Sequence, residues 1–207
     1  MPFPMVHFYV AHDPVIIKKA TDFSQFYLGI LAPDAYRSRI DYTLADRGAS
    51  HLAADDIEHW QKNILDFYEK FKYGNQKCFC LGYCIHILTD IYWDSMIFQP
   101  FLAALSKDEK ASSLNQRQAY MSDMTMIDLY LYRNCGFKKD LWDYLVHGES
   151  FDVLGLVTAA EINAERDLTL VWYDRKKDHP VDGLKYITID QVMDFLDNSA
   201  NEISRRI

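Results

Sequence analysis

The stretch LGYCIHILTD, residues 81–90, is almost wholly apolar but contains one imidazole, His86, and one carboxylate, Asp90. A buried carboxylate is unfavourable unless it is paired or coordinates a metal. On a helix, residues four positions apart share one face, so these two side chains could hold a single ion. A core histidine hydrogen-bonded to an aspartate one turn away is the alternative.

The helix containing this stretch is expected to run from about Lys77 to Phe98. Its start is apolar nearly all round, which is typical of the central helix of a bundle. We expect Pro100 to bend or break it. Before it, apolar residues recur at three- and four-residue steps from Asp55 to Lys72, which predicts one amphipathic helix.

Capping residues and stop signals predict the remaining helices. They cover residues 4–12, 14–20, 22–32, 113–135 and 138–146, and a final helix follows Thr188. The helix over 22–32 must end before Pro33, because the residue preceding a proline avoids helical geometry.

Two segments near the C-terminus have high β-propensity. LTLVWYD (168–174) and LKYIT (184–188) flank a turn-rich link, which predicts a small hairpin. We therefore predict an all-α, multi-helix bundle over residues 1–207, forming one domain decorated by a hairpin at about 168–188.

Composition narrows the function. The 207 residues are 49% hydrophobic, and 22 basic against 30 acidic residues give a net charge of −8. This charge disfavours binding along nucleic-acid phosphates. We see no secretory signal and no uncharged run of the ~18 residues that suggest a membrane span, so we expect a cytoplasmic protein. The four cysteines form no paired CxxC motif, which favours reduced core thiols over a structural zinc site.

Three further residues are candidate metal ligands. Asp34 follows Pro33 at a bend, His51 precedes the amphipathic helix, and His7 has apolar neighbours in the first helix. Each has a structural alternative: Asp34 as a helix cap, His51 as a surface loop residue and His7 as a satisfied core histidine. With the 81–90 stretch they make three imidazoles and two carboxylates, a donor set suited to zinc and other divalent metals.

Four segments in series resemble the bacterial zinc-dependent phospholipase C family, especially its small cytoplasmic members. They are PMVHFYVA, FYLGILAPDAYRSR, ASHLAADD and LGYCIHILTDIYW, all within about the first 100 residues. The resemblance implies an all-helical bundle that holds zinc ions between its helices and hydrolyses phosphodiesters.

The resemblance also implies a ligand set. Asp34, His51, His86 and Asp90 would hold one zinc ion, and Asp90 would bridge to a second ion bound by His7. The histidines of the family's remaining site have no counterpart here, so we expect one or two ions.

If the site is catalytic, the ions would attract a phosphoester despite the acidic surface. Asp34 is then the candidate for orienting the attacking water or accepting its proton, and Arg37 could contact phosphate, unless it is a solvated surface arginine.

We expect a small phosphoester or a phospholipid head group as substrate. The alternative is a non-catalytic helical protein that keeps a structural zinc site. The sequence carries no signal for an oligomeric state.

Overall fold

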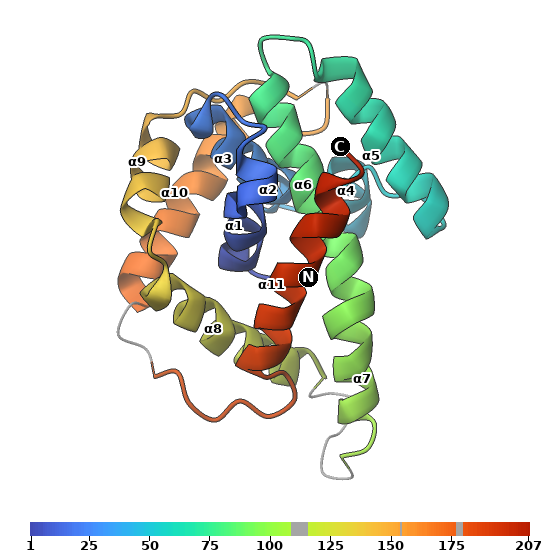
Figure 1. Ribbon diagram of the computed structural model, residues 1–207, viewed down its shortest axis with the longest axis vertical. Coiled ribbons are helices and arrows are strands. Elements are labelled where there is room, and N and C mark those ends of the chain that lie inside the picture. The colour runs from blue at the N-terminus through green and yellow to red at the C-terminus, as the bar shows by residue number, and fades with distance from the viewer. Residues whose placement is uncertain (109–115, 154, 177–179) are drawn as a thin grey trace.

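The protein is described by a computed structural model, in which helix α6 (Lys77–Trp93) is the centre of the fold (Figure 1). The described residues are 1–108, 116–153, 155–176 and 180–207. Every residue of α6 from Cys78 to Ile91 is buried, so the predicted central helix is confirmed. Helix α3 (Phe23–Leu31) makes the most extensive contact with α6, and helices α1, α5 and α11 also pack against it.

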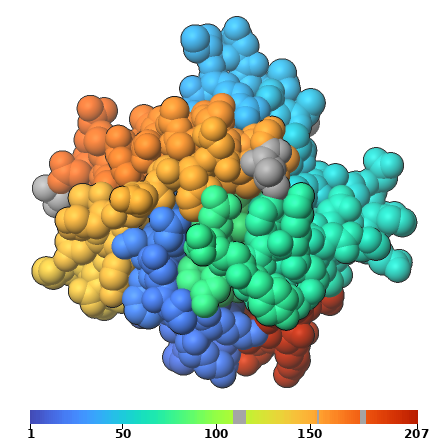
Figure 2. Space-filling view, turned by 90° about the horizontal axis from the view of Figure 1, so that it is seen from above, coloured from blue at the N-terminus to red at the C-terminus, as the bar shows by residue number. Residues whose placement is uncertain are grey.

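The other elements surround α6 on several sides. Their bounds are α1 (Pro4–His12), α2 (Pro14–Ile17), η1 (Ala32–Ser38), α4 (Leu44–Ser50), α5 (Ile57–Phe71), η2 (Asp94–Phe98), α7 (Gln99–Leu105), α8 (Gln116–Asn134), α9 (Lys138–His147), α10 (Ala159–Lys176) and α11 (Ile189–Ser204). Figure 2 shows the teal helix α5 and the light-blue segment between η1 and α4 projecting from the body of the molecule. Of α5, only Ile64 and Phe67 are buried, so these projecting parts contribute little to the core.

Helices α3 and α6 touch backbone to backbone through two glycines. A Cβ atom on Gly82 would lie 2.1 Å from the carbonyl oxygen of Phe26, and one on Gly29 would lie 2.0 Å from that of Phe79. This close approach also brings the carbonyl oxygen of Ile30 to within 2.6 Å of Nδ1 of His86. The glycine contact therefore sets the position of a candidate metal ligand.

The predicted interruption near Pro100 takes the form of a π-turn. The five-residue π-helix η2 joins α6 to α7, and Pro100 stands in the first turn of α7. The proline has no N–H to donate, so it interrupts the hydrogen-bond ladder of the continuous helical run directly after the π-turn.

The N-terminal helices begin where their capping residues predict, although α2 ends at Ile17 and not at Ala20 as expected. Asp13 accepts a hydrogen bond from the backbone N–H of Val15 and caps α2, and Asp22 caps α3 in the same way. Helix α3 ends at Leu31, and the chain continues as the 3-10 helix η1 with Pro33 in its first turn. The bend expected before Asp34 is thus a change of helix type.

A buried carboxylate fixes the start of α1. Asp128 of α8 accepts hydrogen bonds from the backbone N–H of Met5 (2.9 Å) and from the hydroxyl of Tyr173 (2.5 Å). Burial raises the pKa of Asp128 to about 7, although both hydrogen bonds lower it. Asp128 therefore ties α1, which carries His7, to α8 and α10.

The predicted C-terminal hairpin is wrong. Residues 168–174 belong to helix α10, and no strand occurs among the residues that the structure describes. The buried side chains of α10 are Ile162, Glu165, Thr169 and Tyr173, which recur at three- and four-residue steps. Two of these four residues are polar, so the buried face of the helix is hard to recognise from the hydrophobic pattern. Packing of α10 in the fold overrides the β-propensity of 168–174.

The second predicted strand, residues 184–188, is held by a side chain instead of a partner strand. The carboxylate of Asp123 accepts hydrogen bonds from the backbone N–H groups of Lys185, Tyr186 and Ile187, at 2.8–3.1 Å. These donors are therefore satisfied without a sheet. Thr188 then caps α11 through a capping box with Gln191, as predicted.

Three other expectations concern the chain as a whole. All four cysteines are free and buried, in agreement with the prediction of reduced core thiols. No helix in the described ranges is both long and apolar enough to cross a membrane. The capping box predicted at 113–116 begins outside the described residues, and the cytoplasmic location stays a prediction.

We predict that Gly82→Ala destabilises the protein by about 1–3 kcal/mol, because the new methyl group would overlap the backbone of α3. For a chain of this size, that cost lowers Tm by roughly 3–10 °C, measurable by thermal unfolding. Gly136→Ala is the matched control, since a Cβ atom there meets nothing within 4 Å. Equal Tm values for the two variants would contradict the close helix contact.

Asp128 should leave a signature in the pH dependence of stability. The pKa of Asp128 is about 7 in the folded protein, above the ordinary value of 3.8. Its contribution to the free energy of unfolding is therefore fully present below pH 3.8 and is lost as the pH rises through 7. Relative to Asp128→Asn, the wild-type free energy of unfolding should fall by about 1.4 kcal/mol per pH unit from roughly pH 5 to 7 and then level off. Parallel curves for the two proteins, measured by urea unfolding with chelator present, would show that Asp128 titrates normally.

Candidate metal centre

The five predicted metal ligands, which come from four separate segments, lie side by side. They are His7 of α1, Asp34 of η1, His51 at the end of α4, and His86 and Asp90 of α6. Two overlapping triads have ligand atoms that all lie within 4.8 Å of one another: one is His7, His86 and Asp90, and the other is Asp34, His51 and His86. Each triad could hold a metal ion.

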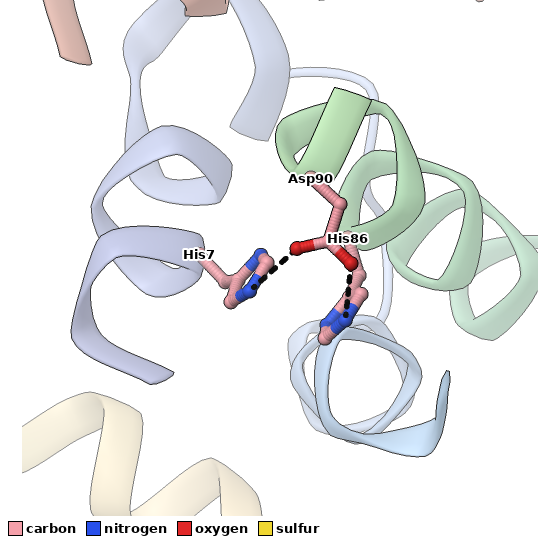
Figure 3. Close-up of side chains that lie close together, drawn as sticks. All are labelled: His7, His86 and Asp90. Atoms are coloured by element: carbon pink, nitrogen blue, oxygen red, sulfur yellow. Dashed lines mark ion pairs between the residues drawn. The ribbon is translucent and has the colours of Figure 1, made fainter. Parts of the chain in front are cut away.

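The carboxylate of Asp90 is the centre of this cluster. Its Oδ1 lies 3.6 Å from Nε2 of His7, and its Oδ2 lies 3.4 Å from Nε2 of His51 and 3.6 Å from Nε2 of His86. Figure 3 shows the rings of His7 and His86 facing different oxygens of Asp90. Such distances are too long for hydrogen bonds. They match the ~3.4 Å edge of a tetrahedron around an ion with bonds of ~2.1 Å.

Four residues of the cluster are buried, and several of their polar atoms have no hydrogen-bond partner among the described residues. Both oxygens of Asp90, Nε2 of His51 and His86, and both ring nitrogens of His7 are unpartnered. The exposed fraction of these four side chains is 2% or less. Buried polar groups are normally satisfied, and an uncompensated buried carboxylate is strongly destabilising. A bound cation would satisfy the Nε2 atoms of the three histidines and the oxygens of Asp90, so the residues present fit a metal ion.

Two of the imidazoles are oriented as metal ligands usually are. Nδ1 of His86 lies 2.6 Å from the carbonyl oxygen of Ile30, and Nδ1 of His51 lies 3.0 Å from that of Arg47. Because a carbonyl oxygen can only accept, each Nδ1 carries the proton. Nε2 is then left with a lone pair directed at the cluster.

Burial favours the neutral forms of His7 and His86. Burial lowers the pKa of His7 well below its ordinary value, and the neighbouring His86 and His51 lower it further. The pKa of His86 is also lowered, mainly by burial, although Asp90 and Asp34 oppose this shift. Neutral imidazole is the form that binds metals, so the site needs little deprotonation at neutral pH.

Asp34 forms the outer wall of the cluster. Its Oδ1 lies 3.6 Å from Nε2 of His51, and its Oδ2 pairs with the guanidinium of Arg37 at 2.9 Å. Burial raises the pKa of Asp34, but Arg37 and His86 outweigh it and hold the pKa below its ordinary value. A carboxylate that stays ionised is suited to binding a cation and is a weak proton acceptor.

The structure adds two charged residues that sequence reasoning missed. Glu165 of α10 is buried and pairs with Arg37 at 2.6 Å, so Arg37 lies between two carboxylates. No pattern in the sequence indicates Glu165. Arg47 lies one turn before His51 in α4, a helix that was not predicted although Thr43 and Asp46 form a capping box that could have revealed it.

The end of α4 holds His51 in place through several contacts. The indole N–H of Trp60 donates to the carbonyl oxygen of His51 at 2.7 Å, and the hydroxyl of Tyr83 donates to that of Ser50. The next residue, Leu52, has a left-handed backbone (φ 53°). It ends the helix in a conformation that glycine usually adopts at this position. His51 is thus a buried helix terminus and not a surface loop residue.

A pocket of about 560 Å³ lies outside Asp34. Three arginines line it, Arg37, Arg47 and Arg117, together with tyrosines and the first residues of the chain. A second pocket of about 340 Å³ shares Arg37 with it and is lined by apolar side chains that include Leu168 and Trp172. Volumes of this size are typical of small-molecule sites.

Comparison of the chain with known protein families, curated proteins and solved structures gives no match. The chain therefore receives no family assignment from these comparisons. What the fold and the site define is an all-helical protein with buried His/Asp groups that could hold a metal ion.

Zinc should stabilise the chelator-treated protein, because it would satisfy the unpartnered atoms around Asp90. At a free zinc concentration of 100 times Kd, linkage gives about 2.7 kcal/mol, or a rise in Tm of roughly 5–10 °C. His86→Ala should lose most of this rise. His59→Ala should keep it, since His59 is exposed and pairs with Asp56 outside the cluster. An equal rise in His86→Ala and wild type would contradict a metal site at the cluster.

Proposed function

We propose that the protein is a zinc-dependent hydrolase of phosphodiester or phosphoester substrates, similar in its chemistry to zinc-dependent phospholipase C. The observation that carries the proposal is the contact between two features: a buried, unpartnered His/Asp cluster, and a pocket rich in arginine that begins at Asp34. A cation site that opens on an anion-attracting pocket suits a phosphate ester in spite of the net charge of −8.

The residues around the pocket would divide the work. A bound divalent ion supplies a Lewis acid for the phosphoryl group and lowers the pKa of water. His7, His51, His86 and Asp90 would hold one or two such ions, and His86 belongs to both triads. Asp34, which stays ionised, would complete a ligand set and orient the attacking water by accepting its hydrogen bond.

Arg37 would contact the phosphate at the mouth of the cluster. Its guanidinium is fixed by Glu165 on one side and Asp34 on the other, while its side chain keeps 41% exposure. Such a held guanidinium presents its remaining N–H donors in a fixed direction, which favours a planar or tetrahedral oxyanion. Glu165 is therefore a positioning residue in this proposal.

The location of the cluster favours catalysis over a purely structural role. Structural zinc sites are closed by protein ligands, whereas catalytic sites keep one position open to solvent or substrate. Asp34 belongs to both the ligand cluster and the pocket wall, so one side of the cluster is reachable from the pocket. We expect a phospholipid head group to bind in this pocket, and the neighbouring apolar pocket with Leu168 and Trp172 would take the apolar part of such a substrate.

Hydrolysis of bis(p-nitrophenyl) phosphate and p-nitrophenyl phosphate by zinc-loaded protein tests the proposal. We expect turnover that chelator abolishes, that Asp90→Asn lowers at least 100-fold, and that the exposed control His59→Ala leaves unchanged. Asp34→Asn should lower kcat more than it lowers zinc content by elemental analysis. Bound zinc without turnover on either substrate would reject the hydrolase and favour the structural zinc site.

A further inference from the structure

The three arginines of the pocket outside the cluster differ in their carboxylate partners. Of these three arginines, Arg37 is already neutralised by contacts with Asp34 (2.9 Å) and Glu165 (2.6 Å). The two carboxylates together exceed its charge. The excess positive charge of the pocket therefore comes from the other two arginines.

Neither Arg47 nor Arg117 forms an ion pair within the described part of the chain, although both line the pocket with Asp34. Arg47 is half-buried and acts electrostatically on Asp34, where it helps to hold the carboxyl pKa down. Its backbone carbonyl also accepts from His51, so its position is tied to the cluster. Arg117 lies in the first turn of α8, and Tyr120 of the same helix also lines the pocket.

The contrast between the paired Arg37 and the two arginines that form no ion pair with a described residue suggests two anion-binding subsites. The first is the cluster itself, together with Arg37, and it takes the phosphoester. The second is formed by two guanidinium groups with no carboxylate partner among the described residues, and guanidinium binds carboxylate or phosphate through paired hydrogen bonds. A neutral or cationic head group would leave these two charges unmatched in the bound state.

We propose that the substrate carries a second anionic group, a carboxylate or a further phosphate, which Arg47 and Arg117 bind while the phosphoester lies at the metal cluster. This inference rests on the proposed function for the first subsite. It makes Arg47 and Arg117 residues that determine specificity, without a part in bond cleavage.

The test compares two probes that differ by one carboxylate. Glycerol 3-phosphate has a single anionic group, and 3-phosphoglycerate has a carboxylate in place of its terminal hydroxymethyl group. Calorimetric titration into zinc-loaded protein should show 3-phosphoglycerate binding about tenfold more tightly or better, as expected for a charge-assisted hydrogen bond. Arg47→Gln and Arg117→Gln should each remove most of this preference, because they should weaken the binding of 3-phosphoglycerate much more than that of glycerol 3-phosphate.

Controls separate this inference from the hydrolase proposal. Arg205→Gln is the matched arginine variant, because Arg205 is exposed and pairs with Glu202 away from the pocket. Zinc content and Tm of each variant verify that the site and the fold are intact. Equal affinities of the wild type for both probes, or equal weakening of both probes by the arginine variants, would overturn the second subsite. Because binding needs no turnover, a preserved preference in a protein without hydrolase activity would reject only the catalytic proposal.

Discussion

The carboxylate of Asp90 is the constraint on which the rest of the structure depends. It is buried at the centre of the bundle, within 3.6 Å of three imidazole nitrogens, and neither of its oxygens accepts a hydrogen bond from a described residue. Separate contacts hold the segments that carry the imidazoles. Asp128 anchors α1, and the glycine contact joins α3 to α6. The fold thus assembles a buried His/Asp group that could hold a metal ion and that would otherwise leave the carboxylate uncompensated.

Much of this site could be predicted from the sequence. The i, i+4 spacing of His86 and Asp90 in an apolar helix implies two polar groups on one buried face, and local geometry is enough to place them together. Asp34 follows Pro33, where the preceding α-helix must end, so the sequence also predicts that Asp34 lies beyond the end of that helix. These are local signals, and the structure agrees with them because helix periodicity and proline sterics operate over a few residues.

The rest depends on contacts distant in sequence. Whether His51 is buried depends on Tyr83 and Trp60, which fix the end of α4 from two other helices. Glu165 is 128 residues from Arg37, and its burial in α10 follows from packing that no local pattern records. The mistaken hairpin has the same origin, because the backbone of 184–188 finds its hydrogen-bond acceptor in Asp123, a side chain some sixty residues earlier.

The unequal exposure of the ligands has a kinetic consequence. Asp34 has 16% of its side chain exposed, whereas His7, His51, His86 and Asp90 have 2% or less. Asp34 is thus the solvent-facing side of the cluster, and its ion pair with Arg37 lies at the wall of the pocket. An ion pair across this side of the cluster would slow the entry of an ion, while the rate of its release would also depend on how tightly the inner ligands bind it.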